Sequence, residues 1–84
     1  MDKLPFGDPL NEDRELSQTF KKIIERLIYI GITLEEAKDE VEKIYIKTTL
    51  KAFSGNRSKT AKQLRIHRNT LNGKIEKYKL DEDS

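Results

Sequence analysis

The chain has 84 residues, of which 35% are hydrophobic and 38% charged, so it is one small domain with little material for an independent core. It has no cysteine and a single histidine, which excludes a disulfide framework and argues against a metal site. Its longest apolar run, residues 27–32, is far below the roughly 20 residues that cross a bilayer. We therefore expect a soluble, cytoplasmic protein without metal or cofactor, which gains stability by forming oligomers.

Charge is distributed unevenly along the chain. Residues 1–54 hold nine basic and eleven acidic side chains, whereas residues 55–80 hold eight basic side chains against Glu76 alone. Three acidic residues then follow in an acidic tail, residues 81–84. This polarity indicates a polyanionic partner for residues 55–80.

Residues 1–12 contain both prolines and show no sustained period. We interpret them as a flexible arm or linker. The segment also carries Leu4, Phe6 and Leu10, so an arm that docks on a partner is the alternative.

The pattern of residues 13–54 predicts two helices. Asn11 or Asp13 can cap the first, which is expected to end near Gly31. Thr33 and Glu36 have the spacing of a capping box for the second, which we expect to run to about Ser54. The short connection favours an antiparallel or steeply crossed hairpin.

The second helix has two apolar faces, one to pack on the first helix and one to hold the carboxy-terminal helices, so many apolar residues of the first helix would stay exposed in a monomer. A dimer built as a four-helix bundle would cover them, and we predict these dimerisation helices on that ground. The alternative is a monomer in which the carboxy-terminal helices fold back over the apolar face of the first helix. The predicted interface consists of Leu16, Phe20, Ile23, Ile24, Leu27, Ile28, Val41, Ile44 and Tyr45.

Residues 55–80 predict two short helices joined by a tight turn, and hence an all-α chain of four helices. Asn56 is placed to cap a helix over residues 57–64, and His67 to cap another over residues 68–77. A small residue inside the first helix, Ala61, and an aliphatic one in the turn, Ile66, are typical of a helix-turn-helix. Tyr78 is interpreted as a core residue rather than a stacking platform for bases.

In a helix-turn-helix the second helix enters the major groove of DNA by its amino-terminal end. The side chains predicted to contact bases are His67, Arg68, Asn69, Thr70 and Asn72, with arginine suited to guanine and asparagine to adenine. The side chains predicted to contact phosphates are Asn56, Arg57, Ser58, Lys59, Lys62, Lys74 and Lys77.

The stretch from Gly55 to Leu80 has the form GN-x-S-K-x-A-x-x-L-x-I-x-R-x-T-L-x-x-K-I-x-K-Y-x-L and follows VEK-x-YI at residues 41–46. On these residues the chain resembles the Fis-type DNA-binding domain, shared by Fis and by the carboxy-terminal domain of bacterial NtrC-type, sigma-54-dependent activators. The resemblance covers residues 34–80 closely and the first helix only in architecture. It implies an intertwined homodimer whose paired recognition helices contact a partly palindromic site on double-stranded DNA and often bend it.

The chain departs from the family pattern at three places. Arg65 stands where the family usually has glycine, so it must adopt a left-handed conformation or the turn must differ. Gly73 and Glu76 lie in the recognition helix where basic residues are common. Lys79 replaces the glycine of the usual Tyr-Gly-Leu ending. We therefore expect the base preference to differ from that of a typical member.

The leading hypothesis is sequence-specific binding to an enhancer as the carboxy-terminal domain of an NtrC-type activator, with ATPase and receiver domains elsewhere in the full-length chain. A free-standing, nucleoid-associated Fis-like protein that bends DNA is the first alternative. A dimerisation or adaptor module without DNA binding is the second. No set of nucleophile, base and orienting residue is visible, so we do not expect an enzyme.

Overall fold

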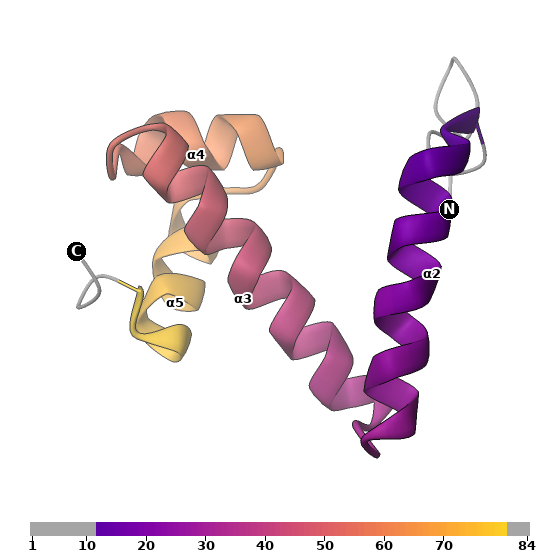
Figure 1. Cartoon of the computed structure of the whole chain (residues 1–84). Helices are drawn as coiled ribbons and strands as arrows, with labels where there is room; N and C mark the ends of the chain where they lie inside the picture. The colour runs from indigo at the N-terminus through magenta and orange to yellow at the C-terminus, as the bar shows by residue number, and fades with distance from the viewer. Residues whose placement is uncertain (1–11, 81–84) are drawn as a thin grey trace. The chain divides into compact units, whose positions relative to one another are not determined.

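The computed structural model describes residues 12–80, and within this range it contains α-helices and no strand. The helices labelled in Figure 1 are α2 (Arg14–Tyr29), α3 (Leu34–Ala52), α4 (Arg57–Leu64) and α5 (Arg68–Tyr78). This confirms the predicted all-α class. The predicted acidic tail and residues 1–11 of the predicted arm lie outside the described residues. No helix in the described part is long and apolar enough to cross a membrane.

The chain divides after Leu34 into two compact units, and α2 lies in the first. Asp13 caps α2, because its carboxylate accepts a hydrogen bond of 2.9 Å from the Leu16 backbone N–H. The helix ends as predicted before Gly31, whose φ of 90° suits a residue without a Cβ. The Ile32 N–H then donates to the Leu27 carbonyl at 2.9 Å, which closes a Schellman motif.

The second unit has a small core to which α3, α4 and α5 all contribute. Its buried apolar residues are Ile46, Ala61, Leu71, Ile75 and Leu80, and Leu50, Leu64, Ile66 and Tyr78 pack against them. In Figure 1, α4 and α5 accordingly lie against the carboxy-terminal half of α3. The predicted roles of Ala61 and Ile66 are confirmed, because the first is buried where α4 meets its neighbours and the second packs into the same cluster.

The core also contains a polar residue, Thr60, which the sequence did not mark as buried. Its side chain is fully buried, and its hydroxyl donates a hydrogen bond of 2.8 Å to the carbonyl of Asn56, the N-cap residue of α4. A satisfied hydroxyl can be buried without an orphaned donor. Periodicity of apolar residues could not identify it, because its partner is the backbone of its own helix.

Three residues other than glycine adopt the left-handed conformation at helix ends. Ser54, Arg65 and Lys79 follow α3, α4 and α5 with φ values of 52°, 59° and 55°. At Arg65 this turns the chain toward α5, and the Ile66 N–H donates to the Ala61 carbonyl at 3.0 Å. Of the two outcomes expected for Arg65 from the sequence, the structure thus shows the left-handed conformation.

Candidate nucleic-acid interface

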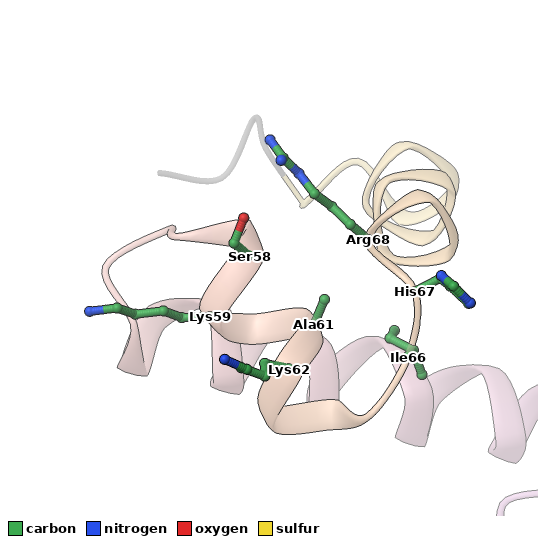
Figure 2. A pocket seen from close by; sticks show the side chains of 7 residues that line it. All are labelled: Ser58, Lys59, Ala61, Lys62, Ile66, His67 and Arg68. Carbon is green, nitrogen blue, oxygen red and sulfur yellow. The ribbon is translucent and has the colours of Figure 1, made fainter.

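An open groove of about 410 Å³ runs along α4 and the turn into α5. Figure 2 shows the side chains that line it, which are Ser58, Lys59, Ala61, Lys62, Ile66, His67 and Arg68. Ala61 and Ile66 supply its apolar part, and the others bring hydroxyl, ammonium, imidazole and guanidinium groups to its rim. Five of the predicted contact residues therefore lie around one groove.

The groove is rich in cations that have no acidic partner. Within residues 12–80 no ion pair involves Lys59, Lys62 or Arg68, and all three side chains are exposed. None of the lining residues is acidic. Such a surface attracts anions without competition from the protein's own carboxylates.

The first turns of α4 and α5 are built as the sequence predicts. The Asn56 side chain caps α4 by accepting a hydrogen bond of 3.0 Å from the Lys59 N–H. His67 occupies the N-cap of α5, although its ring makes no capping hydrogen bond. Asn69 and Thr70 lie in the first turn of α5, and both are exposed. The polar side chains at the start of α5 are thus presented to solvent rather than to the core.

Lys74 lies elsewhere and has a partner within the chain. Its ammonium group donates to both carboxylate oxygens of Glu42 on α3, each at 3.0 Å. The Tyr78 hydroxyl donates to the same carboxylate at 2.6 Å. Together these contacts join α5 to α3, and they were not predicted from the sequence. Lys74 and Tyr78 lie one helical turn apart on α5, but no local period relates them to Glu42 on α3, so only the fold could bring the three together.

This network changes the acid–base behaviour of its members. The hydrogen bond from Tyr78, and next the one from Lys74, lower the pKa of Glu42 below its usual value of 4.5. The same bond to Glu42, helped by desolvation, raises the pKa of Tyr78 to about 12. Glu42 is therefore held as a carboxylate and Tyr78 as a neutral phenol.

Three further predicted contact residues, Lys77, Arg57 and Asn72, are also engaged within the chain. The ammonium group of Lys77 lies 3.9 Å from an Asp39 carboxylate oxygen on α3 and 5.1 Å from the centre of the Tyr78 ring. The Arg57 guanidinium donates to the Asn72 side-chain oxygen at 3.0 Å. The basic candidates thus fall into two groups, with Lys59, Lys62 and Arg68 free along the groove and the others paired.

The residues predicted for the dimer interface lie in both units, and most are exposed in the single chain. On α2 no residue is buried, and Phe20 is 41% and Ile28 68% exposed. On α3, Val41, Ile44 and Tyr45 are exposed, whereas Ile46 on another face lies in the core. This confirms that α3 has one face against α4 and α5 and a separate apolar face. The dimer itself stays a prediction.

These features define a helix-turn-helix domain. α4 and α5 pack together, a left-handed residue sets the turn between them, and the start of the second helix is polar and exposed. Residues 39–78 match the family model described as "Bacterial regulatory protein, Fis family", which identifies this segment as a Fis-family helix-turn-helix domain. The match begins within α3 and ends with α5. Comparisons with curated proteins and with solved structures gave no significant match.

Proposed function

We propose that the helix-turn-helix binds double-stranded DNA in a sequence-specific manner. The observation that carries the proposal is the groove along α4 and the turn, where Lys59, Lys62 and Arg68 have no acidic partner. The family of the matched segment supports it, because the description of that family is of bacterial regulatory proteins. Lys59 and Lys62 contact phosphates, and the exposed residues at the start of α5 contact bases.

In this proposal the chain is the carboxy-terminal domain of an NtrC-type activator and binds an enhancer site as a homodimer. Two copies joined through α2 and the outer face of α3 present two α5 helices to a partly palindromic site. The exposed apolar residues on α2 support this arrangement. The domain acts by binding alone, and any ATPase activity belongs to another part of the full-length protein.

Selection from random duplexes, followed by titration of the enriched duplex and of a random one, tests the proposal. We expect preferential binding of the enriched duplex and a steep fall in affinity with salt, since cations that contact phosphates release counterions. Failure to bind any duplex at low salt would refute DNA binding and leave the adaptor module as the function. Strong bending of many unrelated duplexes without a preferred site would favour a free-standing Fis-like protein.

Arg68→Ala separates base contacts from phosphate contacts. If Arg68 binds a guanine through two hydrogen bonds, its loss weakens binding to the enriched duplex by about 1–3 kcal/mol and relaxes the preference at one base pair. Lys38→Ala removes the same charge from an exposed ion pair on α3 and serves as the control. An equal loss on enriched and random duplexes would show that Arg68 contacts a phosphate.

A further inference from the structure

A second groove, of about 280 Å³, lies between the first residue of α4 and the middle of α5. Arg57, Asn72, Gly73, Ile75 and Glu76 line it. Arg57 and Asn72 are both half-buried, and the guanidinium donates to the Asn72 side-chain oxygen at 3.0 Å. These two side chains therefore form one unit in the chain, although they lie on different helices.

The chemistry of the guanidinium determines how the asparagine is presented. A guanidinium has five N–H donors and no acceptor, so it can pair only with the oxygen of the Asn72 amide. That oxygen is then partly used, while both N–H donors of the amide and most of those of Arg57 remain. The pair is consequently rich in donors and carries a positive charge.

Donor-rich groups distinguish between the purines in the major groove. Guanine presents two acceptors there, whereas adenine presents one acceptor and one donor. An unpaired asparagine favours adenine, because its oxygen accepts from the adenine amino group while its nitrogen donates. When Arg57 is bound to the Asn72 oxygen, its positive charge disfavours the approach of the adenine amino group to the same oxygen. Guanine, which offers two acceptors, then becomes the better partner.

Glu76 and Gly73 make the groove suited to a base pair rather than to a phosphate. The Glu76 carboxylate repels a phosphate but can accept a hydrogen bond from the amino group of cytosine. A Cβ added at Gly73 would meet no atom of the chain within 4 Å, so packing does not require glycine there. The absence of a Cβ at Gly73 leaves room for a ligand to approach the α5 backbone closely.

We infer that Arg57 and Asn72 act as a pair that selects guanine, and that the groove beside Gly73 binds a G·C base pair. This inference rests on the proposed DNA binding and replaces the adenine preference expected for Asn72 from its residue type alone. Arg57 is here a specificity-determining residue that acts partly through Asn72, rather than a contact to a phosphate.

Comparison of base preference in matched variants tests the inference. The enriched duplex is titrated in versions with each base pair exchanged, and Asn72→Ala identifies the position that depends on Asn72. We expect guanine there in the original chain, with a discrimination against adenine of about tenfold. Arg57→Met frees the Asn72 oxygen and shifts the preference toward adenine, whereas Arg57→Lys retains a donor and keeps guanine.

Asn72→Asp provides a second test. It keeps a partner for Arg57 but removes the two amide donors, so the guanine preference is expected to fall at least fivefold while the unfolding temperature is retained. Three results would overturn the inference alone. They are a preference for adenine at the position that depends on Asn72, an unchanged base preference in Arg57→Met, and an equal loss of affinity for all duplexes in the variants. Failure of the original chain to bind any duplex would instead refute the proposed function, and the inference with it.

Discussion

At the scale of single residues, Glu42 shows how a charge on α3 organises the helix-turn-helix. Its carboxylate accepts hydrogen bonds from Lys74 and Tyr78, both on α5. Bonds to a charged acceptor are stronger than those between neutral groups, but the Lys74 and Glu42 side chains are each about a third exposed, which reduces the contribution of the bond between them. The Lys74 ammonium group is thus engaged within the chain, where its ion pair with Glu42 stabilises the packing of α5 on α3.

Glu42→Gln is expected to lower the free energy of unfolding by about 1 kcal/mol at neutral pH. Because the folded pKa of Glu42 is lowered, its contribution is present above pH 4.5 and is lost as the pH falls through the lowered value. Urea unfolding of both chains at neutral and acid pH measures this. The difference should shrink in acid, and a difference that stays constant with pH would show that the carboxylate charge contributes nothing.

Arg65 illustrates a different cost, that of a left-handed backbone in a residue with a Cβ. Its φ of 59° costs an L-residue roughly 1–2 kcal/mol, of which the greater flexibility of unfolded glycine would offset about half. Arg65→Gly is therefore expected to stabilise the domain by about 0.5–1 kcal/mol in thermal or urea unfolding.

Gln63→Gly, two residues earlier and within α4, is the matched control for Arg65→Gly. A glycine at this helical position should destabilise the domain by up to about 1 kcal/mol. If both substitutions destabilised the domain equally, the left-handed conformation of Arg65 would have no measurable cost.

At the scale of elements, α5 combines a buried edge with an interior that is unfavourable for a helix. Leu71 and Ile75 are buried, and Ile75 anchors the helix two residues after Gly73. Gly73 lowers helix propensity, and its missing Cβ would meet nothing within 4 Å. Tertiary packing rather than propensity therefore holds this part of α5 in place.

Gly73→Ala is expected to raise the free energy of unfolding by about 1 kcal/mol, as measured by urea unfolding. Gly31→Ala is the control, because a Cβ there would also meet no atom, yet the φ of 90° strains any other residue. The two changes should act in opposite directions. A destabilising Gly73→Ala would mean that α5 has a packing constraint at this position that the free chain does not show.

At the scale of the whole molecule, an exposed apolar surface lies along α2. None of its residues is buried, although Phe20, Ile23 and Ile28 belong to a continuous helical stripe. An exposed stripe of this kind in a small domain is the basis on which the dimer is predicted.

Phe20→Asp tests this assignment. The original chain is expected to sediment as a dimer, with twice the monomer mass of 9.8 kDa, and Phe20→Asp as a monomer, because a carboxylate in the interface loses its hydration. Gln18→Asp adds the same charge on the polar face of α2 and should leave the dimer intact. An unchanged mass for Phe20→Asp would show that the interface lies elsewhere.

The sequence by itself determined the helices, the caps at Asp13 and Asn56 and the helix-turn-helix, because each depends on local chemistry. Asp13, Asn56 and Gly31 act on backbone groups within a few residues, and residue type identified Ala61 and Ile66 as parts of the helix-turn-helix. The tertiary structure decided which polar residues pair, because the Glu42–Lys74 and Arg57–Asn72 contacts join separate helices. Folding alone therefore separates the basic side chains that are free to bind a partner from those that hold the domain together.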